Sequence, residues 1–163
     1  MTTRRDARPY LLLLAVLAVV LDRLSKLWIV KHVDPAEPIT IIPHVFRITH
    51  VLNTGAAFSL FEDMSPLAVR NGLVAFSLLA VALVLVLLWR TGRTFSMGSV
   101  AFALILGGAI GNLYDRIRFH HVIDFLEVHI VHYHWPDFNI ADSCICIGAA
   151  LLFLEIFRPQ REA

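Results

Sequence analysis

Two aspartates in this sequence stand where a carboxylate has a chemical use. Asp124 lies in the segment HVIDFLEV between apolar neighbours, where helix capping does not explain it, and Asp142 lies in the segment PDFNIADS. An ionised carboxylate takes a proton from water while a protonated partner polarises a carbonyl, which is the acid–base pair that peptide hydrolysis requires. The alternative for Asp142 is ordinary capping, because a helix with Asn139 as its N-cap would place Asp142 at the third helical position.

Other polar residues interrupt apolar stretches of the chain. Counted along helices, Asp22 lies roughly 18 Å into the first stretch, Asn112 roughly 25 Å into the third and Asp142 about 6 Å into the fourth. Lys26 follows Asp22 by one turn, and Arg116 follows Asn112 by one turn. A charge at a bilayer centre costs about 2.5–3.5 kcal/mol, so clustering at one depth predicts a single site. The alternatives are a self-neutralising Asp22–Lys26 ion pair and an Arg116 that extends to lipid phosphates.

The elements that carry these residues are apolar enough to cross a membrane. Of the 163 residues 58% are hydrophobic, mean hydropathy is +0.71, and apolar stretches lie near 10–30, 67–89, 95–114 and 138–157. Each has roughly the 20 residues that span a bilayer as a helix. The first stretch lacks a small-residue cleavage site and is read as a retained helix. The sequence therefore predicts an all-α polytopic membrane protein with four transmembrane helices, forming a single domain over residues 1–163.

The distribution of arginines predicts the orientation in the membrane. Basic residues gather before the first stretch, in the second link and after the last stretch, at Arg4, Arg5, Arg8, Arg90, Arg93, Arg158 and Arg161. The positive-inside rule makes that side cytoplasmic and places both termini there. The net charge of +1 suggests no nucleic-acid partner. The longer segments near 31–66 and 116–137, which hold all eight histidines, fall on the outer side.

The outer segments show strand and turn patterns. The sequence is β-rich from Ile39 to Leu52 with a break at Pro43, then predicts a turn at Asn53–Gly55 and a short amphipathic helix. The second segment alternates apolar and polar residues near its middle. Such strands would form a small extracytoplasmic β-cradle or lid, and a simple spacer hairpin is the alternative. In the third stretch, Gly107 and Gly111 have the GxxxG spacing that predicts close helix packing.

Five motifs in chain order resemble the bacterial lipoprotein signal peptidases, the signal peptidase II family. They are DRLSK at 22–26, NTGAAFS at 53–59, GGAIGNLYDRI at 107–117, VIDF at 122–125 and FNIADS at 138–143. Two departures from the family pattern are Arg23, where the family often has Gln, and His121, where it often has Gly.

The resemblance implies an aspartic endopeptidase in which Asp124 and Asp142 form the catalytic dyad. It implies polar residues lining the site and residues supporting it, namely Asn53, Asn112, Arg116 and Asn139 for the lining and Asp22, Lys26, Gly55, Gly108 and Asp115 for the support. It also implies four helices with a β-cradle and a short helix, in the bacterial cytoplasmic (inner) membrane with the site near the outer face. The expected partners are prolipoproteins with a diacylglyceryl-modified cysteine, cut just before that cysteine, together with membrane lipids and globomycin-type cyclic peptides. No cofactor and no metal are expected.

Competing functions have weaker support in the sequence. Five histidines lie close together in the second outer segment and make a metal or haem site an alternative, namely His120, His121, His129, His132 and His134. The zinc motif HExxH is absent from the sequence. Histidines that lie at the membrane interface or face the substrate fit better. An ion transporter would show duplicated halves and broken helices. A presenilin-like protease would add GxGD to the half-signature Tyr114–Asp115, and a serine protease would need a GxSxG elbow.

The surroundings of the two aspartates predict where a shared proton resides. Asp142 in a first helical turn would face free amides and the positive end of the helix dipole, which favour its ionised form. Asp124 lies among Val122, Ile123 and Phe125, whose partial desolvation raises a carboxyl pKa. We therefore expect the proton mainly on Asp124 and the charge on Asp142.

Overall fold

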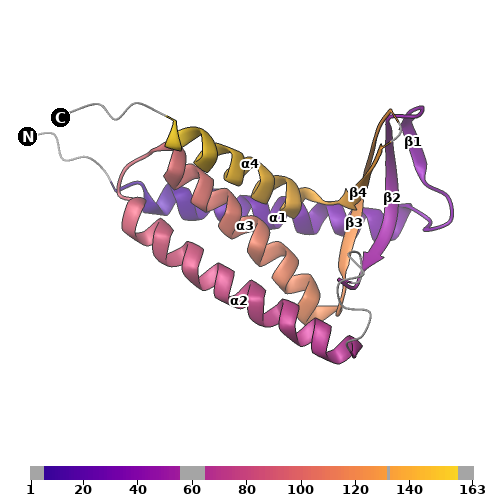
Figure 1. Ribbon diagram of the computed structural model, residues 1–163, viewed down its shortest axis with the longest axis horizontal. Helices are drawn as coiled ribbons and strands as arrows, with labels where there is room; N and C mark the ends of the chain where they lie inside the picture. Colours follow the sequence, from indigo (N-terminus) through magenta and orange to yellow (C-terminus); the bar gives the residue numbers. More distant parts are fainter. Residues whose placement is uncertain (1–5, 56–64, 132, 158–163) are drawn as a thin grey trace, which may run out of the picture.

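The computed structural model describes residues 6–55, 65–131 and 133–157, in which four helices run side by side and a four-stranded sheet lies at one end of them (Figure 1). The helices are α1 (Arg8–His32), α2 (Pro66–Thr91), α3 (Met97–Arg118) and α4 (Ile140–Ile156). The strands are β1 (Ile39–Ile42), β2 (Phe46–Asn53), β3 (Val122–Ile130) and β4 (Tyr133–Phe138). The amphipathic helix predicted after Gly55 falls on residues 56–64, outside the described residues.

Helix α3 is the element on which the other three helices pack. A Cβ added to Gly107 would lie 2.7 Å from the Ala15 carbonyl oxygen of α1, and one added to Gly108 would overlap the Ala141 carbonyl of α4. The helices approach so closely because these positions carry no side chain. The GxxxG stripe is thus a packing surface, as its spacing predicts, and it brings the polar residues of α1, α3 and α4 into one neighbourhood.

The sheet joins the two outer segments of the chain. Its order is β1-β2-β3-β4 with every neighbouring pair antiparallel, and Val51 on β2 lies opposite Asp124 on β3. Successive side chains of a strand point to opposite faces. Ile123 and Phe125 pack against Ile29 of α1, so Asp124 between them points to the other face. Because β2 of the first outer segment pairs with β3 of the second, the first segment is not a simple spacer hairpin.

The helix boundaries agree with the hydropathy pattern except at two ends near the sheet. Helix α3 continues to Arg118, beyond the predicted limit at residue 114, and therefore carries Arg116 on a regular helical turn. Phe138, predicted as the start of the last helix, belongs to β4, and α4 begins after the N-cap Asn139. At both ends the backbone hydrogen bonds of a helix or strand continue past the point where the hydropathy changes, and these bonds set the boundary.

Candidate active site

Asp124 is held on β3 by two side-chain amides. Asn53 Nδ2, at the end of β2, donates to Asp124 Oδ2 at 2.9 Å, and Asn139 Nδ2 donates to Asp124 Oδ1 at 2.7 Å. Asn53 is itself fixed by its turn, since its Oδ1 accepts from the backbone N–H of Gly55 at 2.8 Å. Gly55 adopts a φ of 90°, a left-handed conformation that favours glycine. The turn therefore orients the amide that orients the carboxyl.

Asp142 is held at the start of α4 by a reciprocal capping arrangement. Asn139 Oδ1 accepts from the Asp142 N–H at 3.0 Å, and Asp142 Oδ2 accepts from the Asn139 N–H at 3.2 Å. Asn112 Nδ2 of α3 donates to the other oxygen, Oδ1, at 2.7 Å. Asp142 thus caps the helix and also belongs to the polar cluster. Its carboxyl is fixed by Asn139, which precedes α4, and by Asn112 of α3.

Two asparagines connect the aspartates. Asn139 Nδ2 lies 3.2 Å from Asn112 Oδ1 as well as 2.7 Å from Asp124 Oδ1. The hydrogen-bonded path therefore runs from Asp142 through Asn112 and Asn139 to Asp124. Asn112 and Asn139 are 5% and 0% exposed, so these hydrogen bonds form away from bulk water and hold both carboxyls with little freedom.

A buried charge cluster lies behind the asparagines, between α1, α3 and α4. Lys26 Nζ lies 2.8 Å from Asp22 Oδ2 and 2.7 Å from Asp115 Oδ2, and all three residues are 0% exposed. Lys26 also donates to Asn112 Oδ1 at 3.2 Å, which orients the amide that holds Asp142. Asp22 Oδ1 accepts from the Ala141 N–H at 3.0 Å and so anchors the first turn of α4.

Arg23 completes the cluster at its edge. Its Nη1 lies 2.6 Å from Asp115 Oδ1, and its guanidinium stacks over the rings of Tyr114 and Phe119. Sequence reasoning missed this contact. The sequence offers Asp115 a nearer basic partner, Arg118 at the i,i+3 spacing on the same helix, so no local signal indicated a partner on α1.

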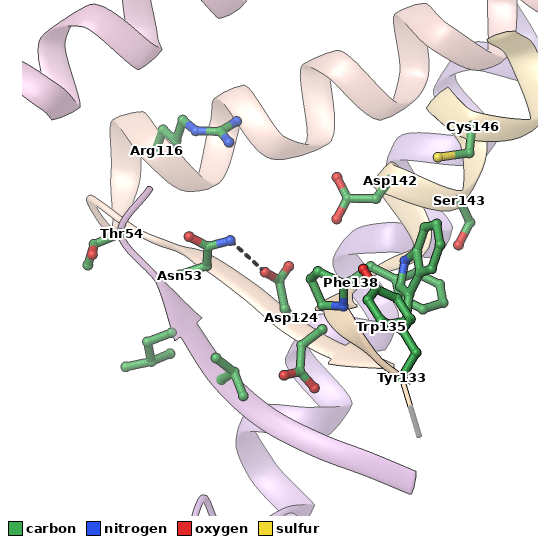
Figure 2. A pocket seen from close by; sticks show the side chains of 14 residues that line it. Asn53, Thr54, Arg116, Asp124, Tyr133, Trp135, Phe138, Asp142, Ser143 and Cys146 are labelled. Atoms are coloured by element: carbon green, nitrogen blue, oxygen red, sulfur yellow. Dashed lines mark hydrogen bonds between the residues drawn. The ribbon is translucent and has the colours of Figure 1, made fainter. Parts of the chain in front are cut away.

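The aspartates open onto a common cavity of about 1040 Å³. In Figure 2, Asp124 from β3 and Asp142 from α4 point toward the same space, and Arg116 enters it from α3. The opposite side is formed by residues of β2 and β4, most of them apolar: Val51, Leu52, Tyr133, Trp135, Pro136 and Phe138. Sequence analysis did not place the β4 aromatics on the wall of a cavity, because that position depends on which strand pairs with β3.

Burial raises the pKa of Asp124 to about 6, with the nearby Asp142 carboxylate adding to the effect. The hydrogen bonds from Asn53 and Asn139 act in the opposite direction, since they stabilise the ionised form. An ordinary Asp titrates near 3.8. Asp124 therefore holds a proton well above the pH at which an exposed Asp loses it.

The structure thus brings together all the residues implicated by sequence. Asp124, Asp142, Asn53 and Arg116 line the cavity, Asn112 and Asn139 bond the aspartates, and Gly55 orients Asn53. The remaining residues lie behind the site, Asp22, Lys26 and Asp115 as the charge cluster and Gly108 at the contact with α4.

Comparison with known proteins finds similarity along nearly the whole chain. The model of a family described as signal peptidase (SPase) II matches residues 14–158. The lipoprotein signal peptidase of Syntrophotalea carbinolica is 41% identical over 152 residues, covering 91% of each chain. That of Pseudomonas fluorescens strain Pf-5 is 44% identical over 150 residues, covering 91% of this chain and 87% of its own.

Two solved structures, each titled as a bacterial membrane enzyme, have the same fold. One superposes with a TM-score of 0.84 at 24% identity, covering 100% of this chain and 99% of its own. The other has a TM-score of 0.77 at 28% identity and covers 97% and 99%.

Proposed function

The chain belongs to the signal peptidase II family, and on that premise we propose that Asp124 and Asp142 are the catalytic pair with which it hydrolyses its substrate. It is a protease that removes signal peptides from prolipoproteins. The observation that carries the proposal is the shared cavity, into which both carboxyls open while asparagine amides fix their orientation.

The chemistry follows from the different surroundings of the two carboxyls. Asp142 in the ionised form takes a proton from a water molecule, whose oxygen attacks the scissile carbonyl carbon. Protonated Asp124 donates a hydrogen bond to the carbonyl oxygen, and the raised pKa of Asp124 suits it to that role. Collapse of the tetrahedral intermediate breaks the C–N bond, and the leaving amine takes up a proton from the pair.

Substrate binding is assigned to groups around the pair. The guanidinium of Arg116 and the amide of Asn53 line the cavity and donate hydrogen bonds, which suits them to hold peptide carbonyls. Asn112 and Asn139 act mainly through the aspartates that they bond. Pocket walls formed by Trp135 and Phe138 provide apolar surface for the substrate.

All four helices are proposed to span the membrane. On length and composition, two of the described helices could cross a bilayer, over Leu67–Thr91 and Met97–Arg118. Helix α1 carries Asp22 and Lys26, but both are 0% exposed, whereas Leu13, Leu24 and Trp28 on its outer surface are about half exposed or more. A helix with inward charges and an apolar outer face suits lipid. Helix α4 has 17 residues and exposes large apolar side chains at Phe153 and Leu154.

From this arrangement we propose an orientation in the bacterial inner membrane. Arg8, Arg90 and Arg93 lie at the end of the helices away from the sheet, which the positive-inside rule makes cytoplasmic. The sheet and the two aspartates then lie at the outer face. A scissile bond just outside the hydrocarbon layer would reach them, with its lipid anchor in the bilayer.

Cleavage is expected to depend on the lipid of the substrate. A precursor whose cysteine lacks diacylglycerol should be cleaved with a kcat/KM at least about 100-fold lower. Each buried methylene group contributes ~0.8 kcal/mol, so the loss of about four of them already accounts for a change of that size. The measurement compares matched lipidated and unlipidated precursors with purified enzyme in lipid nanodiscs. Equal rates for the two would contradict the proposed substrate, while leaving a peptidase activity in place.

The pH dependence of cleavage is expected to follow Asp124. With a pKa of about 6 in the free enzyme, its protonated form is present below pH 6 and is lost as the pH rises through that value, so kcat/KM should fall on the alkaline side. Asn53→Ala removes a hydrogen bond that lowers this pKa, and the alkaline limb should therefore move to higher pH. Thr54→Ala, the adjacent cavity residue, is the control and should leave the limb in place. A shift to lower pH in Asn53→Ala would show that Asp124 does not govern this limb.

A further inference from the structure

A second cluster of ligating side chains lies on the sheet, on the face away from the catalytic pocket. His129 on β3 and His134 on β4 are directly opposite partners across the two strands. Glu127 precedes His129 by two residues and therefore shares its face. Asp124 has the opposite parity on β3, and the neighbouring β4 residues Tyr133 and Trp135 line the catalytic cavity. The cluster is thus separated from the reaction by the thickness of the sheet.

Three potential ligand atoms converge in this cluster. Nε2 of His129 lies 3.0 Å from Glu127 Oε1, and Nε2 of His134 lies 2.8 Å from the same oxygen. One ligand atom from each residue lies within 4.8 Å of the other two. Around a tetrahedral zinc ion, ligand atoms at about 2.0–2.2 Å from the metal stand about 3.3–3.6 Å apart. Small rotations of the two imidazoles would open these contacts to that spacing.

Glu127 is prepared for coordination by its neighbour on β2. Arg47 donates from Nη2 to Oε1 at 2.6 Å and from Nε to Oε2 at 2.5 Å, which makes a bidentate ion pair. This pair fixes the orientation of the carboxylate. Carboxylates that bind metals are usually held in the same way, by a hydrogen bond from a second residue. The Oε1 lone pair not used by Arg47 faces the imidazoles.

The accessibility of the three side chains also suits an ion that enters from solvent. The Glu127 side chain is 6% exposed, whereas those of His129 and His134 are 31% and 49% exposed. The carboxylate thus lies below two accessible imidazoles, and an ion held by all three could take a water molecule from solvent as its fourth ligand. Imidazole nitrogen with a carboxylate oxygen is a donor set that suits Zn²⁺ and not Mg²⁺ or Ca²⁺.

We propose that Glu127, His129 and His134 form a zinc-binding site on the outer sheet. The ion replaces the hydrogen bonds between the imidazoles and Glu127 and joins β3 to β4 beside their turn. Because β4 supplies the aromatic wall of the catalytic cavity from its other face, zinc stabilises that wall without contacting the substrate. The proposal stands independently of the catalytic assignment of the aspartates.

The test uses the full chain, purified in detergent with an affinity tag that contains no histidine and stripped of metal with EDTA. Zinc titrated by calorimetry should saturate a single class of site with roughly one ion per chain. Loss of one direct ligand in His134→Gln should weaken binding at least about tenfold, and loss of two in the double variant His129→Ala, His134→Ala should weaken it further. Zinc should raise the melting midpoint of the unmodified protein and not that of the double variant.

The control is His44→Asn, an exposed histidine of the same outer region whose left-handed φ of 62° asparagine tolerates. It should bind zinc as the unmodified protein does. Absence of saturable binding, or equal binding by the double variant, would overturn the proposal, the second outcome meaning that other histidines hold an adventitious ion. Cleavage by the stripped enzyme should equal that of the zinc-loaded enzyme, and a requirement for zinc in turnover would contradict a site remote from the reaction.

Discussion

Replacing either Asp124 or Asp142 by Asn is expected to lower kcat by about 10²-fold to 10⁴-fold, the usual contribution of general acid–base groups. Each carboxyl opens into the shared cavity, and an amide can neither take a proton from water nor give one to the leaving amine. The measurement is single-turnover cleavage of a lipidated precursor. Asp137→Asn is the matched control, because Asp137 is a third carboxylate of the same cavity and is bonded by the Thr49 hydroxyl at 2.9 Å.

The two variants should remain folded, which separates loss of chemistry from loss of protein. In each variant the new Asn side chain presents its NH₂ group to one of the N–H donors that bond the native carboxyl. That donor then lacks an acceptor, which costs about 1–3 kcal/mol. Membrane insertion and abundance should stay nearly normal. Substantial turnover by either variant at normal abundance would exclude the proposed pair.

The same variants locate the shared proton through inhibitor binding. An Asn imitates the protonated, neutral carboxyl, so Asp124→Asn should retain most of its affinity for a globomycin-type peptide that meets one charged and one neutral group. Asp142→Asn should weaken that binding more. Because coupled carboxyls titrate as a pair, binding to the two variants assigns the proton where a pH profile cannot. The reverse order would place the proton on Asp142.

The largest effect on stability is expected from Lys26→Met. The change leaves two carboxylates, Asp22 and Asp115, without the buried ammonium group that lies within 2.8 Å of each. Removing one partner of a buried ion pair costs about 3–5 kcal/mol. It also removes the hydrogen bond that Lys26 donates to Asn112. The cleavage rate should therefore fall at least as much as the fraction of folded protein.

Thermal unfolding in detergent measures this effect, with Lys31→Met as the control. Lys31 lies in the last turn of the same helix and is exposed, so its replacement should leave the melting midpoint nearly unchanged. If Lys26→Met melted like the unmodified protein, water or lipid headgroups would have to reach the cluster, and its burial between the helices would be refuted.

The helices and the catalytic candidates could be predicted because their signals are local. Runs of apolar residues predict the four helices, and Asn139 followed by Asp142 predicts the start of α4 with its capping contacts. The GxxxG spacing of Gly107 and Gly111 predicts a close helix contact, though not which helix makes it. A Cβ at Gly111 would lie 2.8 Å from Asp22 Oδ2, so the stripe faces the charged part of α1.

The rest depends on contacts between distant parts of the chain. Val51 pairs with Asp124, and Arg23 pairs with Asp115, and no periodicity of either segment specifies its partner. Histidines near the outer surface were expected to be interfacial or to face the substrate. Strand alternation along β3 sets His129 on the other face of the sheet from Asp124, but only the register of β3 with β4 shows that His134 lies beside it.

The contact between Asp22 and the N–H of Ala141 has a consequence for biosynthesis, because its partners are 119 residues apart. At about 5–20 residues per second, helix α1 waits on the order of ten seconds for the last helix to be made. During that interval Asp22 and Lys26, which lie one turn apart on α1, neutralise each other's charge as an ion pair within the helix. Asp142 arrives with α4, so the proposed catalytic pair stays incomplete until that helix has been made.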